Sequence, residues 1–189
     1  ADLMALLSNH PNIVTIYQAD ITDGRPYLVM EYCSNDNLGV AYKTAPLKVS
    51  AALHAIIQIA GAVETVHRAG ILHRDIKPAN VLVTAYNVPV LTDFGISVVT
   101  GDTSGAQGLS IPWAPPEAIA DTSRAGIAAD VYSLAATLYT LLAGRTPFEL
   151  PGGDNSMLAP VARIEQLPVP ALGRADIPPV LQQVLPIAM

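Results

Sequence analysis

The feature of the sequence that most constrains the fold is a pair of short polar clusters. The first runs from His73 to Asn80 (His-Arg-Asp-Ile-Lys-Pro-Ala-Asn), and the second, Asp93-Phe94-Gly95, begins thirteen residues after Asn80. Two short apolar runs, 81–83 and 90–92, lie between the clusters and flank the turn-forming residues 85–87, a pattern that predicts a β-hairpin. The two clusters are therefore expected at the two ends of one hairpin.

Both clusters resemble known motifs of the eukaryotic-type (Hanks-type) serine/threonine protein kinases. The family patterns are His-Arg-Asp-x-x-x-x-Asn followed by Asp-Phe-Gly, and every fixed position is matched here. A lone His-Arg-Asp is compatible with an ordinary turn, but the ordered set at this spacing is specific. The Ala-rich helices and the Ser-Ile-Pro-Trp-x-Pro-Pro-Glu loop resemble those of the bacterial branch, in particular kinases of high-GC bacteria.

The resemblance implies a role in phosphoryl transfer for each polar residue of the clusters. Asp75 would orient the acceptor hydroxyl and take its proton, and Lys77 would neutralise the transferring phosphate. Asn80 and Asp93 would bind Mg²⁺, a hard cation that prefers oxygen ligands and keeps some of its coordination for substrate phosphates. ATP and Mg²⁺ are therefore the expected cofactors, and Asp75, Lys77 and Asn80 are the expected catalytic residues.

Two residues favour serine and threonine as acceptors. Lys77, two residues after Asp75, is typical of serine/threonine kinases, whereas tyrosine kinases place arginine elsewhere in this loop. Ser110 matches the hydroxyl residue that bonds both Asp75 and Lys77 in the serine/threonine branch. The implied activity is transfer of the ATP γ-phosphate to serine or threonine, with proteins as the expected substrates.

Residues 97–110 contain Gly, Ser and Thr without apolar periodicity, and they predict an activation segment. In the family, the arginine at the position of Arg74 pairs with a phosphate on this segment through charge-assisted hydrogen bonds. The candidate phosphate carriers are Thr100, Thr103 and Ser104, so self-phosphorylation is expected.

Residues 110–117 (Ser-Ile-Pro-Trp-Ala-Pro-Pro-Glu) resemble the substrate-docking loop of the family and its Ala-Pro-Glu motif, here Pro-Pro-Glu ending at Glu117. A proline-rich loop fixed by Trp113 would explain the same residue types. The distance of this loop from Asp93 favours the kinase interpretation.

The N-terminal part predicts a short helix over residues 1–7 and then two strands, 13–17 and 27–31, joined by a turn at Asp23-Gly24-Arg25-Pro26. The resemblance places the adenine site after the second strand. Its expected contacts are the side chain of Met30, backbone groups of Glu31 and Cys33, and Leu82 as the floor under adenine. A buried strand followed by a linker would account for the same residue types.

Two long helices are predicted, over residues 50–69 and 130–143, and a further one begins at residue 178. Ser50 is the expected N-cap of the first helix, which Gly70 ends. In the resemblance, Asp130 bonds the backbone near His73 and Arg74, although an acidic residue at a helix N-terminus is favourable by itself. His73 and Phe94 are expected to be core residues rather than chemical ones.

Composition excludes several classes of function. The net charge of −6 does not favour nucleic-acid binding. The four histidines show no metal-ligand spacing, and the single cysteine can form no internal disulfide. The best membrane-span candidate, residues 131–144, has only fourteen uncharged residues against the roughly 20 needed, so no membrane span is expected. The kinase domain is expected to lie in the cytoplasm.

The expected fold is α+β and protein-kinase-like, with residues 1–32 as a remnant of the small lobe and residues 33–189 as a large lobe whose C-terminal end is missing. The family's Gly-rich loop, strand-three lysine and αC glutamate are not in the sequence. The 189 residues alone are therefore expected to be inactive and aggregation-prone, and Mg²⁺-dependent phosphorylation by them would contradict this. A pseudokinase or scaffold module is the alternative.

Overall fold

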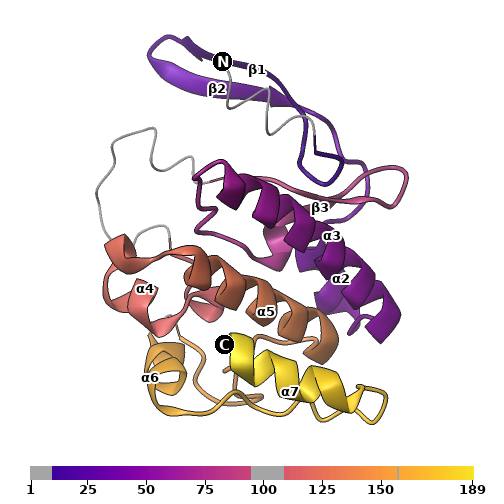
Figure 1. The fold of residues 1–189 in the computed structure, drawn as a ribbon, viewed down its shortest axis with the longest axis vertical. Helices are drawn as coiled ribbons and strands as arrows, with labels where there is room; N and C mark the ends of the chain where they lie inside the picture. The colour runs from indigo at the N-terminus through magenta and orange to yellow at the C-terminus, as the bar shows by residue number, and fades with distance from the viewer. Residues whose placement is uncertain (1–9, 95–108, 157) are drawn as a thin grey trace.

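The computed structural model describes residues 10–94, 109–156 and 158–189. A β-hairpin stands apart from a mainly helical body, in which α3 and α5 lie across the middle and α6 and α7 at the far end (Figure 1). This arrangement is the α+β architecture expected from the sequence. The elements in chain order are β1 (Ile16–Thr22), β2 (Arg25–Met30), α2 (Leu38–Thr44), α3 (Val49–Arg68), η1 (Pro78–Asn80), β3 (Val81–Val83), β4 (Pro89–Leu91), η3 (Ile111–Trp113), α4 (Pro116–Ala120), η4 (Thr122–Arg124), α5 (Ile127–Ala143), α6 (Ala159–Gln166) and α7 (Pro179–Ala188).

Strands β1 and β2 form the predicted antiparallel hairpin, but β1 begins later than the sequence suggests. Asp23 and Gly24 have φ angles of 52° and 73°, which suits the tight two-residue turn that joins twisted strands. Ile13 and Val14 were expected in the first strand. They are instead 2% exposed, and the Val14 N–H donates to the Leu91 carbonyl at 2.9 Å. Burial of these two side chains therefore ties the chain to β4 before β1 starts.

Helix α3 confirms the first predicted long helix, but not its N-cap. The helix begins at Val49 after Lys48, and no side chain caps it, so Ser50 lies inside the first turn. The Leu47 N–H donates to the Leu141 carbonyl at 2.8 Å, which fixes the chain to α5 just before the helix begins. At the other end, Gly70 has a φ of 76°, and the N–H of Ile71 donates to Val66, a typical glycine-terminated helix end.

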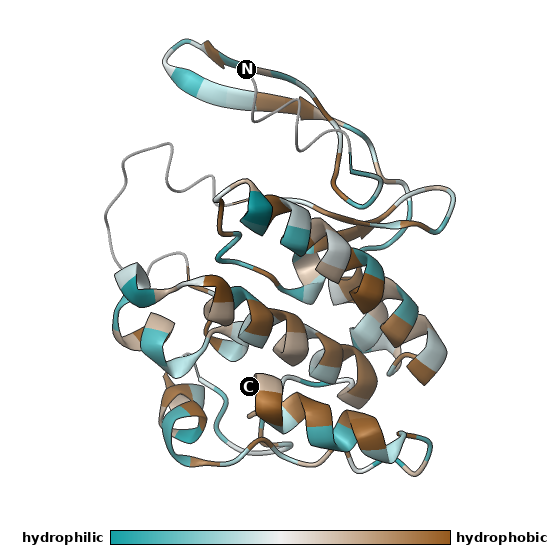
Figure 2. Cartoon of the chain, viewed as in Figure 1, coloured by the Kyte–Doolittle hydropathy of each residue, from teal (hydrophilic) through white to brown (hydrophobic). Residues whose placement is uncertain are grey.

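Helices α3 and α5 pack together at the centre of the core, and hydrophobic residues run along most of α5 (Figure 2). Ile59 and Val66 of α3 and Tyr139 and Leu142 of α5 are fully buried. Helix α5 starts three residues before the predicted Asp130 and ends at Gly144, as expected, where φ is 71°. The structure confirms the small predicted hairpin of β3 and β4, and Val81, Val83 and Leu91 of this hairpin belong to the same core cluster.

In the described part of the chain, α3 is the one helix long and apolar enough to cross a membrane by length and composition alone. The sequence had suggested residues 131–144, and not this helix, as the best membrane-span candidate. A core helix passes the same test, and Ala52, Ile59, Ala62 and Val66 of α3 are fully buried in the protein. The helix therefore has the environment of a core element.

The C-terminal part contains short helices between prolines, as predicted, and one side chain ties it to the core. Arg174 Nη1 donates to the carbonyls of Leu47 and Leu142, both at 2.8 Å, while its Nε and Nη2 bind the two carboxylate oxygens of Asp176. Leu142 lies in the last turn of α5, where a cation is favourable. The bond from Arg174 holds the pKa of the Asp176 carboxyl below its usual value.

Replacing Arg174 with methionine should lower the free energy of unfolding by about 2 kcal/mol, because the charged donors of two carbonyl acceptors are lost. Urea denaturation measures the change. Arg68→Met is the matched control, because Arg68 is 79% exposed in its i,i+4 pair with Glu64, and such pairs contribute less than about 0.5 kcal/mol. Equal effects of the two substitutions would contradict the role assigned to Arg174.

Candidate active site

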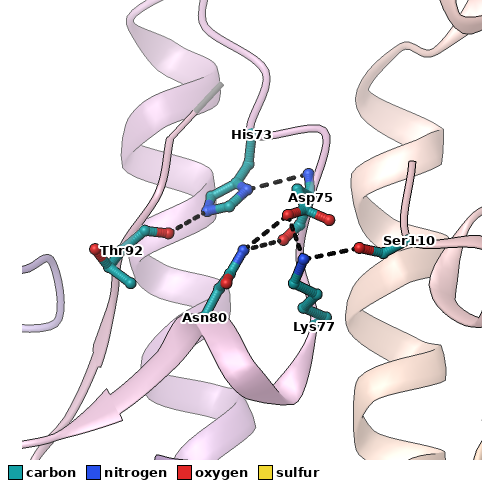
Figure 3. Close-up of polar contacts among 6 residues, drawn as sticks. All are labelled: His73, Asp75, Lys77, Asn80, Thr92 and Ser110. Carbon is teal, nitrogen blue, oxygen red and sulfur yellow. Dashed lines mark hydrogen bonds and ion pairs between the residues drawn. The ribbon is translucent and has the colours of Figure 1, made fainter. Parts of the chain in front are cut away.

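The candidate site is built around the carboxylate of Asp75, in the loop between α3 and η1 (Figure 3). Lys77 Nζ donates to Asp75 Oδ2 at 2.7 Å, and Asn80 Nδ2 donates to the same oxygen at 3.0 Å and to the Asp75 carbonyl at 2.8 Å. The second oxygen, Oδ1, is buried and has no hydrogen-bond partner in the described part of the chain. A hydroxyl donor placed there would satisfy it, and a buried acceptor left unsatisfied costs free energy.

Lys77 connects this carboxylate to the loop before α4. Its Nζ also donates to Ser110 Oγ at 2.8 Å (Figure 3). The sequence predicted that Ser110 bonds both Asp75 and Lys77. Among the described residues the structure shows the bond to Lys77 alone, because the ammonium group lies between the hydroxyl and the carboxylate. Ser110 therefore contacts Asp75 only through Lys77.

A small hollow, with room for little more than one water molecule, adjoins Asp75. Residues 74–76 line one side of the hollow, and the loop that contains η3 lines the other. Two segments more than thirty residues apart in the sequence therefore face each other here. Its lining residues are Arg74, Asp75, Ile76, Leu109, Ser110, Trp113, Ala114 and Ser133. A hydroxyl that reached this hollow would meet the Asp75 carboxylate, to which the Lys77 ammonium group is bonded.

The loop owes its shape to a buried carboxylate on α5. Asp130 is 1% exposed, and its two oxygens accept the backbone N–H groups of His73 and Arg74, each at 2.8 Å. Both contacts were expected from the sequence. Arg74 has a φ of 66°, a left-handed conformation that is unfavourable for a residue with a side chain. The bonds from Asp130 help to hold the backbone in this conformation.

His67 is a participant that the sequence did not reveal. Its Nε2 lies 2.8 Å from Asp130 Oδ2, and its side chain is 7% exposed. The motifs of the sequence give His67 no role. A histidine on the buried face of α3, just before the loop that contains Asp75, could have indicated such a contact, because buried polar groups need hydrogen-bond partners.

His73 connects the two polar clusters and is a core residue, as predicted. Its Nε2 lies 3.0 Å from the Thr92 carbonyl, and its Nδ1 accepts the Asp75 N–H at 3.3 Å (Figure 3). The ring packs on Phe94 with centroids 4.8 Å apart. Burial lowers the pKa of His73, so the ring is neutral at pH 7, with Nδ1 free to accept and Nε2 carrying the proton.

The donor set of Asn80 and Asp93 fits a magnesium ion. Asn80 uses its amide nitrogen for the contacts with Asp75, which leaves its carbonyl oxygen for a cation. Asp93 is exposed, has a φ of 62° and forms no ion pair with another described residue. No group of three His, Cys, Asp or Glu side chains gathers anywhere in the described ranges. Few protein ligands suit Mg²⁺ with a phosphate substrate, because phosphate oxygens and water complete its coordination.

The residues that the resemblance places beside adenine lie at the end of β2, in the segment after it and in β3. Met30 ends β2, and the N–H of Glu31 donates to the Thr15 carbonyl at 2.8 Å, leaving the Glu31 carbonyl available. Cys33 follows two residues after Glu31, and burial raises the pKa of its thiol. Leu82 alternates with Val81 and Val83, which face the core, so it points to the opposite face of β3.

Other predicted site residues lie away from Asp75 or outside the described residues. Thr100, Thr103 and Ser104 belong to the latter group, and so does the helix predicted over residues 1–7. Glu117 is in the first turn of α4. Burial, with the nearby Glu117 charge, raises the pKa of Tyr132 to about 12. Glu117 therefore lies close enough to Tyr132 of α5 for its charge to act on that phenol, and it does not line the hollow beside Asp75.

Comparison with protein families decides the classification. A model of the protein kinase domain matches residues 1–178. The chain belongs to the protein kinase family. The kinase domain is similar to the serine/threonine-protein kinase PknK of Mycobacterium tuberculosis, with 39% identity over 93% of the chain and 16% of PknK. It is 34% identical to PknJ of the same species over 91% of the chain and 30% of PknJ. Against PknB of Mycolicibacterium smegmatis the identity is 33%, over 94% of the chain and 30% of PknB.

Proposed function

We propose that the protein transfers the γ-phosphate of ATP to serine or threonine hydroxyls of other proteins. The kinase domain spans 16% to 30% of the length of the three relatives named above, all of them serine/threonine-protein kinases by name. The observation that carries the proposal is the state of Asp75. One of its carboxylate oxygens is held by Lys77 and Asn80, and the other is a buried acceptor without a partner among the described residues.

In this mechanism Asp75 fixes the acceptor and receives its proton. The serine or threonine hydroxyl donates to Oδ1, and its proton moves to that oxygen as the hydroxyl oxygen bonds to the γ-phosphorus and the bond from that phosphorus to the departing ADP oxygen breaks. Because Oδ2 is fixed by two donors, the carboxylate cannot turn away from the acceptor. Correct placement of reacting groups supplies much of the rate in phosphoryl transfer.

The neighbouring residues stabilise charge. Lys77, held between Asp75 and Ser110, places an ammonium group where negative charge accumulates on the transferring phosphoryl oxygens. The oxygens of Asn80 and Asp93 would hold Mg²⁺. Bound ATP and Mg²⁺ supply the phosphoryl group and part of its charge neutralisation. The carbonyl of Glu31, the backbone of Cys33 and the side chains of Met30 and Leu82 would hold the adenine.

The division into lobes and the control of activity are part of the same proposal. The hairpin of β1 and β2 stands apart from the helical body, which supports a boundary near residue 32 between a small and a large lobe (Figure 1). Arg74 is exposed beside the hollow. It would pair with a phosphate that the protein places on its own Thr100, Thr103 or Ser104.

The test uses the full-length protein with radiolabelled ATP, Mg²⁺ and four peptides that differ only in one acceptor residue: serine, threonine, tyrosine or alanine. Label should enter the serine and threonine peptides, and removal of Mg²⁺ with EDTA should stop it. Label in the tyrosine peptide alone would overturn the acceptor assignment. No label in any peptide would overturn the proposed activity in favour of a scaffold.

A further inference from the structure

The buried hydroxyl of Thr140 forms an unusual connection between the core and the loop opposite Asp75. Thr140 lies in α5 and is fully buried. Its Oγ1 accepts the indole N–H of Trp113 at 3.0 Å and donates to the Ala136 carbonyl at 2.7 Å. The bond to Ala136 fixes the direction of the hydroxyl hydrogen, so a lone pair is directed at the indole.

Trp113 carries this connection to the site. It is the last residue of η3, and its backbone N–H donates to the Ser110 carbonyl at 2.9 Å. Ser110 in turn accepts from Lys77, which holds Asp75. Four hydrogen bonds, joined through the covalent frames of Trp113, Ser110 and Lys77, therefore connect the interior of α5 to the carboxylate of Asp75. The Trp113 side chain also lines the hollow beside that carboxylate.

The loop needs such an anchor because η3 is only three residues long. Its own backbone bonds join Trp113 to Ser110 and Ala114 to Ile111, and two such bonds fix little of its position relative to α5. The indole N–H is a donor only, so it must find an acceptor when it packs against a protein interior. The Thr140 hydroxyl provides that acceptor at one defined place.

We propose that Thr140 is a positioning residue for the acceptor side of the site. Through Trp113 it sets the place of Ser110, and thereby the geometry of Lys77 and Asp75 around the entering hydroxyl. Thr140 touches neither substrate nor nucleotide. The inference rests on the proposed function of Asp75 and Lys77, and it adds a residue of α5 that acts on them from the core.

The same helix provides a matched control. Thr137 is also fully buried in α5, but its Oγ1 has no hydrogen-bond partner in the described part of the chain. Valine has nearly the shape of threonine without the hydroxyl. Thr140→Val therefore removes the acceptor of the indole, whereas Thr137→Val removes a hydroxyl that bonds none of the described residues. Thr140→Ser keeps the acceptor and removes only a methyl group.

The first measurement is the steady-state kinetics of the full-length protein and these three variants. Thr140→Val should lower kcat/KM for the acceptor peptide about tenfold, the effect of one hydrogen bond, with KM for ATP unchanged. Thr140→Ser and Thr137→Val should have the same kcat/KM for the peptide and the same KM for ATP as the parent protein. A general loss of folding would lower kcat/KM for the peptide and for ATP together, so a fall of equal size for both substrates would overturn the inference. Unchanged kinetic constants of Thr140→Val would overturn it as well.

A second measurement does not depend on catalysis. The exchange of the Trp113 indole proton with D₂O can be followed by NMR, with the signal assigned through Trp113→Phe. Exchange should be slow in the parent protein and in Thr137→Val, and faster in Thr140→Val. If the parent protein labels no peptide, the proposed function fails, and this exchange still decides whether Thr140 holds Trp113. Unchanged exchange in Thr140→Val would overturn the positioning role.

Discussion

Replacing Asp75 with asparagine should lower kcat by about 10²–10⁴-fold, the usual contribution of a positioned general base. Asparagine has the size of aspartate, and its carbonyl oxygen can still accept from Lys77 and Asn80. It cannot accept a proton from the acceptor hydroxyl, and its amide places a donor where the unpartnered Oδ1 of Asp75 now lies. The fold and the affinity for ATP should therefore remain, while transfer to the peptide is lost.

Steady-state kinetics with a serine peptide provide the measurement, with KM for ATP as the internal check. Asp154→Asn is the control, because that aspartate is exposed and its carboxylate accepts the N–H of Ser156, two residues further along the chain. It should leave kcat unchanged. A kcat for Asp75→Asn within about threefold of the parent value would contradict the general-base assignment, since such a residue contributes at least about 10²-fold.

Replacing Asp130 with alanine should lower the free energy of unfolding by about 3–5 kcal/mol, the cost of removing one partner from a buried polar cluster. The substitution leaves the N–H groups of His73 and Arg74 and the ring of His67 without the acceptor they share. Because these N–H groups define the loop that carries Asp75, the activity of the remaining folded protein should fall as well.

Urea denaturation measures this loss, and Asp36→Ala provides a comparison. Asp36 is exposed and makes no side-chain hydrogen bond or ion pair with another described residue, so its removal should change stability by less than about 0.5 kcal/mol. The loss of stability caused by Asp130→Asn should lie between the losses caused by Asp130→Ala and Asp36→Ala. The amide oxygen can accept one of the two N–H groups, whereas the NH₂ group opposes the other. Equal stability of Asp130→Ala and Asp36→Ala would show that the loop does not depend on the buried carboxylate.

The existence of the main elements could be predicted from the sequence, because it follows from local patterns. Short apolar runs on either side of turn residues identified both hairpins, helical spacing of apolar residues identified the long helices α3 and α5, and Gly70 and Gly144 marked helix ends. The starting points could not be predicted, because distant contacts decide them. Ile13 and Val14 attach to β4, and Leu47 is bonded to α5 before α3 begins.

The same distinction applies to the site. Asp75, Lys77 and Asn80 lie within six residues, so their meeting follows from one local motif. The contacts of His67 with Asp130 and of Trp113 with Thr140 join segments 63 and 27 residues apart. Apolar periodicity shows which face of a helix is buried. It does not show which polar group on that face meets a partner from another segment.

The left-handed backbone at Arg74 and Asp93 has a consequence for how this domain tolerates change. Their φ angles of 66° and 62° cost each residue about 1–2 kcal/mol that glycine would not lose. A variant library selected only for heat resistance should therefore enrich glycine at both positions, whereas selection for phosphate transfer should retain the arginine and the aspartate. At these two positions the residue that favours stability differs from the residue that favours activity, as is common where backbone strain is kept at functional sites.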